Sequence, residues 1–158
     1  MGNVHIRPAV ASDMLAVHSL IHELAIYERA PEEHSCTVDQ LVIDGFSENP
    51  AFDCWVAEIN DIVVGMMLYY VKYSTWKGKC IYLDDIIVTE SARGKGVGRV
   101  LLNQLIRIAR ARKMHRLEWQ VLNWNEPAIH FYEKFGVDLD PDWINCRLTF
   151  AQLQAYAD

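Results

Sequence analysis

Apolar residues first recur at helical spacing and later at the spacing of strands. Met14, Val17, His18, Ile21, Leu24 and Ala25 fall three and four residues apart, which places them on one face of a helix. This pattern predicts a helix that is capped by Ser12 or Asp13 and continues to about Glu28. Residues 37–46 predict a second helix, capped by Thr37 and ended by Gly45, and residues 4–7 predict a short strand before both.

The period then changes to that of a sheet. Residues 54–58, 62–71 and 81–88 are rich in β-branched and aromatic side chains, which favour strands. Asn60-Asp61 lies between the first two runs and is typical of a tight hairpin turn. The three runs therefore predict a meander of antiparallel strands.

The second half alternates helix and strand. A helix is expected from Val97 or Gly98, because Val100, Leu101, Leu105, Ile108 and Ala109 form an apolar stripe. A strand over 116–121, a helix over 126–135, a strand over 143–150 and a terminal helix over 151–157 follow. This order predicts one domain over residues 1–158, an α/β (α+β) fold with a mixed sheet flanked by helices.

A glycine-rich loop joins the third strand run to the long helix. In Arg93-Gly94-Lys95-Gly96-Val97-Gly98-Arg99, three alternate glycines lack the Cβ that would keep an anion away from the main chain. Exposed N–H groups at a helix N-terminus, surrounded by three cations, form a site suited to phosphate. The spacing fits neither a P-loop, which needs Lys followed by Ser or Thr, nor the G-x-G-x-x-G dinucleotide fingerprint.

Charge is concentrated around the same loop. Residues 93–116 hold eight of the fifteen Lys and Arg and no acid, whereas the whole chain has a formal net charge of −6. A compact cationic zone on an acidic chain suits a small polyanion with several phosphates. It does not suit nucleic acid, which the wider acidic surface would repel.

Composition narrows the remaining classes of protein. No run approaches the roughly 18 apolar residues of a membrane helix, and no signal peptide is evident. Cys36, Cys54, Cys80 and Cys146 are scattered, which favours reduced thiols and a cytoplasmic protein. His18 and His22 lie one helical turn apart, but the sequence lacks the H-E-x-x-H pattern and an evident third ligand, so no metal is expected.

Two motifs carry a resemblance to a known family. Residues 82–98 contain the strand YLDDIIV and the loop RGKGVG, and these resemble the acetyl-CoA motif of the GNAT N-acetyltransferases. WNEPA at 124–128 and FYEKFG at 131–136 resemble that family's second signature. The likeness extends from about His5 to Phe150. Within the superfamily it is strongest to the diamine (spermidine/spermine) and thialysine acetyltransferases.

The resemblance implies a GNAT fold, acetyl-CoA as co-substrate and direct attack by an amine, with no covalent acetyl-enzyme. It implies that the main chain of one strand pairs with the pantetheine arm, that the loop amides hold the diphosphate and that the next helix head contacts CoA. The expected cofactor-binding residues are Ile86, Ile87, Val88, Arg93, Gly94, Lys95, Gly96, Val97, Gly98, Arg99, Asn125, Ala128 and Tyr132. Main-chain N–H groups near Ile86 or Ile87 are expected to stabilise the oxyanion.

Two residues are expected to handle protons. Tyr132 occupies the tyrosine of the Phe-Tyr signature, which implies a general acid for the CoA thiolate. Asp84 and Asp85 are adjacent acids in an apolar strand run, so they are expected on opposite faces, with Asp84 toward the substrate. The diamine acetyltransferases have Glu where this chain has Asp84, and the shorter side chain favours a water relay or simple cation binding.

Further residues are expected to contact the amine. Tyr27 and Glu28 match substrate-contacting positions of the family, and Trp76 offers a wall for an alkylammonium chain. Ser74 and Thr75 replace an acid of the polyamine branch, which favours a lysine-like or thialysine-like substrate over spermidine. The complete substrate-binding set is Tyr27, Glu28, Ser74, Thr75, Trp76, Asp84, Asp85, Glu118, Trp119 and Gln120.

The sequence also allows two other functions: acetylation of a protein N-terminus or lysine, and non-catalytic binding of acyl-CoA. The expected partner is a small amine, with neither nucleic acid nor membrane. A homodimer is also expected, because the family commonly pairs through its C-terminal strands.

Overall fold

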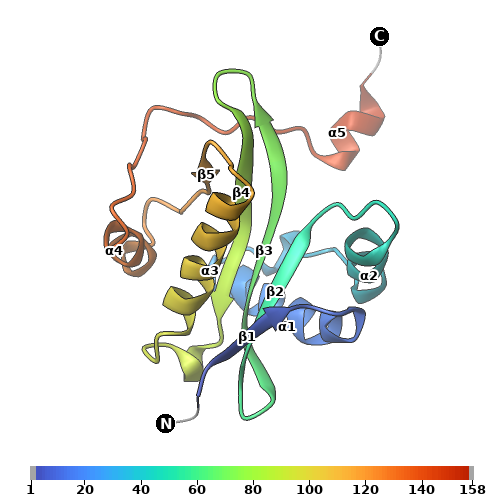
Figure 1. The fold of residues 1–158 in the computed structure, drawn as a ribbon. Helices are drawn as coiled ribbons and strands as arrows, with labels where there is room; N and C mark the ends of the chain where they lie inside the picture. The colour runs from blue at the N-terminus through green and yellow to red at the C-terminus, as the bar shows by residue number, and fades with distance from the viewer. Residues whose placement is uncertain (1–2, 157–158) are drawn as a thin grey trace. The chain divides into compact units, whose positions relative to one another are not determined.

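The computed structural model describes residues 3–156 (Figure 1). Its contacts divide the chain into two compact units, one ending at Gln120 and one beginning at Val121. The first unit contains the whole sheet, and the second contains two short helices, α4 (Glu126–Glu133) and α5 (Phe150–Ala155). The expectation of one domain over residues 1–158 stays a prediction.

The first unit is a mixed five-stranded sheet with helices on both faces, as the alternation of elements predicts. The strands lie in the order β1-β2-β3-β4-β5; the first four are antiparallel neighbours, and β5 pairs parallel with β4. The elements are β1 (His5–Pro8), α1 (Met14–Tyr27), α2 (Val38–Phe46), β2 (Asp53–Ile59), β3 (Ile62–Ser74), β4 (Gly78–Val88), α3 (Val97–Ala111) and β5 (Leu117–Glu118), with 3₁₀ turns η1 (Ala11–Asp13), η2 (Pro31–Glu33) and η3 (Glu90–Ala92).

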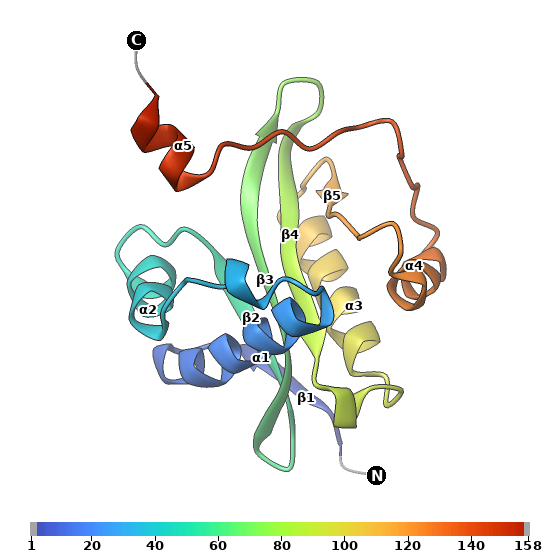
Figure 2. The ribbon, with the colours of Figure 1, turned by 180° about the vertical axis from the view of Figure 1, so that it is seen from behind.

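Helices α1 and α3 cover opposite faces of the sheet, as the two views from opposite sides show (Figures 1 and 2). The α1 face holds a buried cluster in which Met14 and Val17 pack against Met66, Leu68 and Ile87. On α3, Leu101, Leu105 and Ala109 of the predicted stripe are buried, while Val100 and Ile108 are partly exposed. Apolar side chains are therefore buried on both faces of the sheet, and β4 is held between α1 and α3.

The predicted helix cap at Thr37 and the predicted turn at Asn60-Asp61 are confirmed. The side chain of Thr37 caps α2, accepting a hydrogen bond from Gln40 N at 3.2 Å. Asn60 and Asp61 have φ of 53° and 60°, the left-handed conformation that a tight hairpin turn requires. Asp13, however, does not cap α1 through its side chain, which binds Arg7 Nη1 at 2.6 Å instead.

The sequence prediction for Gly45 is wrong. Helix α2 continues through Gly45 to Phe46. A Cβ at this position would lie 2.6 Å from the ring of Phe52. The glycine therefore permits close packing rather than ending the helix.

The strand expected over 143–150 is also wrong, and that over 116–121 is reduced to β5. Residues 143–149 have no regular structure, and Thr149 instead caps α5, which begins at Phe150. Thr149 Oγ1 accepts from Gln152 N, and Gln152 Oε1 accepts from Thr149 N, so a capping box directs this segment into a helix. Alternating apolar side chains alone do not supply the neighbouring edge that a strand needs.

Gly65 sets the distance between β3 and the start of α3. A Cβ there would lie 2.9 Å from Ile87 O and 3.2 Å from Val97 Cγ1. Its absence allows Val97 to pack beside β4, which holds the glycine loop at the end of that strand. Among residues 3–156, no helix combines the length and apolar character needed to cross a membrane.

Candidate active site

Strand β4 is irregular where its two acids lie. Leu68 pairs with Asp85, and the next residue of β3, Tyr69, pairs with Leu83. Asp84 is therefore an extra residue with no opposite partner, which defines a β-bulge. A bulge turns side chains away from simple alternation, so the faces of the two aspartates cannot be read from their spacing.

The pairing places Asp85 on the α1 face. Its partner Leu68 alternates with Tyr70, and Tyr70 faces Tyr82, so Asp85 and Tyr82 share one side of β4. Burial raises the pKa values of Tyr82 and Asp85, and the charge of Asp84 raises both further. The charge of Asp84 therefore reaches the groups around Asp85, and the expectation that the two aspartates face opposite sides stays a prediction, because the bulge interrupts the alternation on which it rested.

A cleft lies between α1, the segment after it and β4, and we call it the acidic cleft. Its volume is about 310 Å³. It is lined by Ile21, Leu24, Ala25, Glu28, Ala30, Glu33, His34, Ser35, Cys36 and Asp85. The described lining includes three carboxylates but no Lys or Arg, so the cleft favours a cation.

Two carboxylates of the cleft, Glu28 and Asp85, hold their protons more tightly than ordinary carboxylates. Burial, followed by the charges of Asp84 and Glu28, raises the pKa of Asp85 to about 7. Burial also raises the pKa values of Glu28 and Asp84 above their ordinary range. A carboxyl group that titrates near neutral pH in a cleft is suited to proton transfer.

One edge of β4 is unpaired next to this cleft. Strand β5 pairs with β4 only at Ile81 and Tyr82, whereas β3 pairs with β4 as far as Val88. Beyond Tyr82, the far edge of β4 has no ladder partner among the described strands. Those main-chain groups of residues 86–88 that point away from β3 can therefore hydrogen-bond to an extended ligand, as the resemblance implies.

The glycine loop is open to a ligand. Gly94 and Gly96 have φ of 74° and 84°, and a Cβ built on either would meet no atom within 4 Å. Gly96 precedes α3, so the first N–H groups of that helix face the loop. These residues fit a diphosphate group, because amides, a helix N-terminus and nearby cations converge there. The buried side chain of Val97 leaves only its main chain for this role.

Side chains tie the loop to α1. The guanidinium of Arg93 lies 5.2 Å from the ring centroid of Tyr27, and Arg93 Nε donates to Val88 O at 3.1 Å. Thr89 Oγ1 donates to Glu23 Oε1 at 3.1 Å. Tyr27 thus supports the loop at the end of β4, and Glu28, the next residue, lines the acidic cleft.

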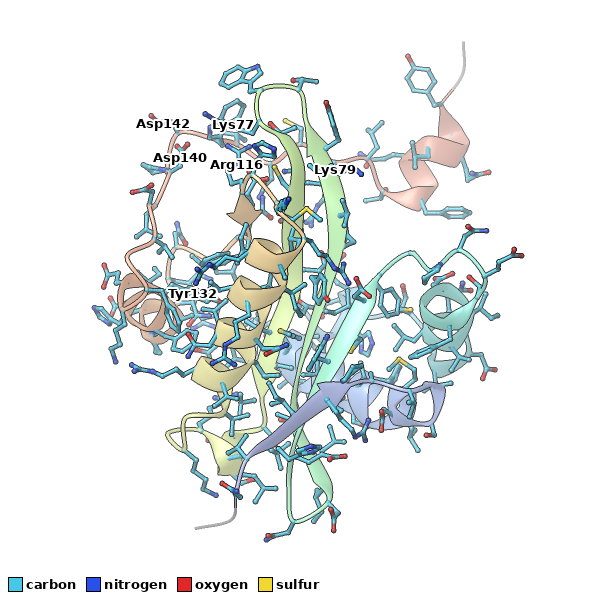
Figure 3. All side chains as sticks on the ribbon, in the orientation of Figure 1. Lys77, Lys79, Arg116, Tyr132, Asp140 and Asp142 are labelled. Carbon is cyan, nitrogen blue, oxygen red and sulfur yellow. The ribbon has the colours of Figure 1, made fainter. Side chains whose placement is uncertain are left out.

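The hairpin residues do not join the cleft. Ser74, Thr75 and Trp76 form the β3–β4 turn, where Ser74 Oγ accepts from Trp76 N and Lys77 N. Strand β4 begins at Gly78, six residues before Asp84, which corresponds to roughly 20 Å along a strand. The turn is surrounded by cations instead, and Figure 3 shows Lys77, Lys79 and Arg116 at this end of the sheet.

Glu118 is occupied by ion pairs at the same end. Its carboxylate lies 3.0 Å from Lys72 Nζ and 3.0 Å from Arg116 Nη2. Trp119 and Gln120 follow β5 at the end of the first unit. The structure therefore brings Glu28, Asp84 and Asp85 together but leaves Ser74, Thr75, Trp76 and Glu118 at the hairpin end.

The second unit holds the remaining predicted residues. Asn125 caps α4, and its Oδ1 accepts from Ala128 N at 3.3 Å. Tyr132 lies on α4 (Figure 3), is 7% exposed and has its ring centroid 5.2 Å from that of Phe131. The cap places Ala128 N–H in a hydrogen bond within the helix, and the next turn carries Tyr132.

Sequence reasoning missed Glu33 and His34, which line the acidic cleft. Both lie in a short connection after Pro31 that has no periodic pattern to mark its direction. The pair His18 and His22 was a partial signal, because His34 packs against both rings. Within residues 3–156, no group of three His, Cys, Asp or Glu side chains is arranged to hold a metal ion.

Comparison with known proteins agrees with this geometry. Residues 17–137 match the model of the acetyltransferase (GNAT) family. The chain is 36% identical over 158 residues to thialysine N-epsilon-acetyltransferase of Mus musculus, covering 93% of each chain. It is also 36% identical over 143 residues to spermidine/spermine N(1)-acetyltransferase-like protein 1 of Homo sapiens, covering 86% of this chain and 21% of that protein.

The fold has a solved counterpart. An integron cassette protein from the mobile metagenome of V. cholerae superposes with a TM-score of 0.77 at 26% identity, covering 96% of this chain and 95% of that one. The sheet, the glycine loop and the family match lead to one conclusion: this chain belongs to the GNAT family of acetyltransferases, enzymes that use acetyl-CoA as co-substrate and transfer its acetyl group to an amine.

Proposed function

We propose that the protein transfers acetyl from acetyl-CoA to a small aliphatic primary amine that carries a second amino group. The acidic cleft is the observation that carries this proposal. It presents Glu28, Glu33 and Asp85 and has no cation in its described lining. Diamines and amino acids with side-chain amines, such as thialysine, share the required pair of amino groups.

The cofactor is held by main-chain groups in this proposal. The unpaired edge of Ile86–Val88 takes the pantetheine arm, and the amides of residues 93–99 take the diphosphate, as the open glycines support. The resemblance to the family also assigns Asn125, Ala128 and Tyr132, all on or next to α4, to cofactor binding. When bound, acetyl-CoA supplies an activated thioester, and the amine attacks it directly.

Asp85 is the first proton acceptor. An alkylammonium has a pKa of about 10.4, so the amine must lose a proton before it attacks. A carboxylate with its pKa raised to about 7 is a better base than an ordinary aspartate. Asp84, which is exposed on the bulge, contributes the charge that helps to raise the pKa of Asp85.

Tyr132 supplies the proton that the CoA thiolate requires. Its position in the Phe-Tyr signature of the family and its burial both support a positioned phenol.

The position of the hairpin bears on whether the substrate needs a carboxylate. A preference for an amino-acid carboxylate rested on the hydroxyls of Ser74 and Thr75. These lie at the hairpin end, and Ser74 Oγ already accepts two main-chain N–H groups. The proposal therefore requires a second amino group and makes the carboxylate optional.

Self-association and a reducing compartment belong to the same proposal. Trp143, Ile144 and Phe150 are 75%, 86% and 78% exposed, an apolar surface that supports a homodimer. The cysteines Cys36, Cys54, Cys80 and Cys146 form no disulfide, which supports a cytoplasmic location.

A panel of amines tests the substrate class. Thiol release from acetyl-CoA is measured with thialysine, lysine, ornithine, putrescine, spermidine, butylamine and a peptide with a free N-terminus. We expect kcat/KM for putrescine to exceed that for butylamine by about tenfold, because a second ammonium group gains about 1.4 kcal/mol in the cleft. Equal values for these two amines, or preference for the peptide, would contradict the proposal.

Asp85→Asn tests the base through two opposite effects. Activity should fall by about 10²- to 10⁴-fold, and the rise of wild-type kcat/KM with pH, centred near 7, should disappear.

The same substitution should raise thermal stability at pH 8 rather than lower it. The native carboxyl binds its proton more tightly than the unfolded chain does, so wild-type stability falls as pH rises from about 4 to about 7. The variant should therefore gain Tm relative to wild type at pH 8 and lose this gain toward pH 4.

The matched control for that substitution is Glu48→Gln, an exposed acid after α2, which should change neither profile. A variant that keeps the wild-type pH profile, or that melts below wild type at pH 8, rules out Asp85 as the buried base.

Gly96→Ala tests the phosphate cradle, with Gly136→Ala as its control. Both glycines have positive φ, and a Cβ on either would meet no atom within 4 Å, so both variants suffer similar backbone strain of about 1 kcal/mol. Only Gly96→Ala places a methyl group in the loop. Calorimetry should show a Kd for CoA raised about tenfold or more in Gly96→Ala and unchanged in Gly136→Ala. Equal affinity in both variants would mean that the loop does not hold the cofactor.

Tyr132→Phe tests the acid, and Tyr156→Phe, which changes a 75% exposed tyrosine of the same unit, is its control. We expect kcat to fall about 10²-fold in Tyr132→Phe with the Kd for CoA unchanged, because only the donated proton is lost. Full turnover across the pH range would remove Tyr132 from the mechanism.

A further inference from the structure

Three histidines cluster beside the acidic cleft, and one of them, His34, lines it. His18 and His22 lie one turn apart on α1, and His34 follows η2. The ring centroids of His34 and His18 are 4.5 Å apart, and those of His34 and His22 are 5.6 Å apart. His34 Nδ1 lies 3.4 Å from His22 Nδ1, so a hydrogen on one nitrogen can be donated to the other.

The other nitrogen of His34 faces a different environment. Nε2 is buried and has no hydrogen-bond partner among the described residues, while His34 lines the cleft together with Asp85. A buried polar atom without a protein partner is normally satisfied by water or a ligand. His34, a residue of the cleft wall, therefore has one nitrogen without a partner among the described residues and the other directed to His22, whose side chain is exposed.

His34 is suited to pass a proton on rather than to keep it. Burial and the charges of His18 and His22 lower the pKa of His34, so its ring is neutral near pH 7 and accepts a proton only briefly. The titratable groups around it are His18 and His22 from α1, Glu28 just after α1, Glu33 and Cys36 from its own segment, and Asp85 from β4. His18 contacts the main chain, with its Nε2 3.1 Å from Cys36 O, which fixes its ring beside His34.

The reaction requires a path for one proton. An ammonium substrate loses two protons as its nitrogen forms the bond to the acetyl carbon and the carbon–sulfur bond breaks. One proton replaces the proton that Tyr132 gives to the CoA thiolate, and the other must reach solvent before Asp85 can accept again. Each turnover therefore releases one proton from the cleft.

We propose that His34 and His22 carry this proton from Asp85 to solvent. The inference rests on the proposed function, because it assumes that an ammonium substrate binds in the acidic cleft. Through water in the cleft, His34 Nε2 accepts the proton from Asp85. His34 then donates the hydrogen on Nδ1 to His22 Nδ1, and the exposed His22 ring releases a proton from Nε2. Exchange with water restores the starting tautomers.

Buffer dependence of turnover tests the relay. Thiol release is measured with acetyl-CoA and putrescine, both saturating, in dilute buffer and in imidazole buffer. We expect kcat of His34→Gln and of His22→Gln to fall about tenfold or more in dilute buffer, with both KM values within twofold of wild type. Imidazole, a diffusible proton carrier, should restore most of kcat. His115→Gln, an exposed histidine at the opposite end of β4, should match wild type in both buffers.

Two kinds of result would overturn the relay. A loss of kcat that imidazole does not restore, or one accompanied by a raised amine KM, would assign His34 to packing or substrate binding and overturn the relay. Wild-type kcat in both variants would do the same. His22→Gln replaces a surface side chain and keeps the test valid if His34→Gln melts at a lower temperature.

The proposed function can fail separately. If wild type turns over no amine of the panel, the proposed function falls and the relay falls with it. If wild type is active and both histidine variants are unchanged in dilute buffer, only the relay is overturned.

Discussion

Strand β4 is fully paired on one edge only, and the site depends on this asymmetry. Its pairing with β3 continues to Val88, while β5 leaves it after Tyr82. The unpaired edge exposes main-chain N–H and C=O groups. These groups need hydrogen-bond partners, either water or a ligand. An extended ligand with amide groups is one way to satisfy them, which is why we place the cofactor there.

The bulge at Asp84 adds the chemistry to this strand. In a regular ladder two adjacent acids would face opposite sides, and only one would reach the α1 face. Burial raises the pKa of Asp85 to about 7, and the charge of Asp84, the extra residue of the bulge, contributes to this shift. Two nearby carboxylates are unfavourable for folding, and their retention in an otherwise apolar strand is explained if a cationic substrate occupies the cleft.

The sequence predicted what local rules control. Glycines and cations at 93–99 were sufficient to locate the loop and the start of α3 at Val97, and the polar pair in an apolar run located the acids. The bulge was not predictable, because pairing with β3 creates it. The hairpin residues were misplaced with respect to the acids because β3 and β4 extend to Ser74 and Gly78, beyond the expected ends at 71 and 81. His34 was missed because its contacts join segments that no periodic pattern relates.

The account depends most directly on a carboxyl group that titrates near neutral pH on the α1 face of β4. Carbon-13 NMR of the Asp85 side-chain carboxyl, followed against pH in the wild-type protein, measures that property without any substrate. We expect a titration midpoint near pH 7, with a smaller shift during the titration of Asp84. A midpoint at the ordinary aspartate value of 3.8 would mean that Asp85 is not held in the buried, acidic environment on which the site depends.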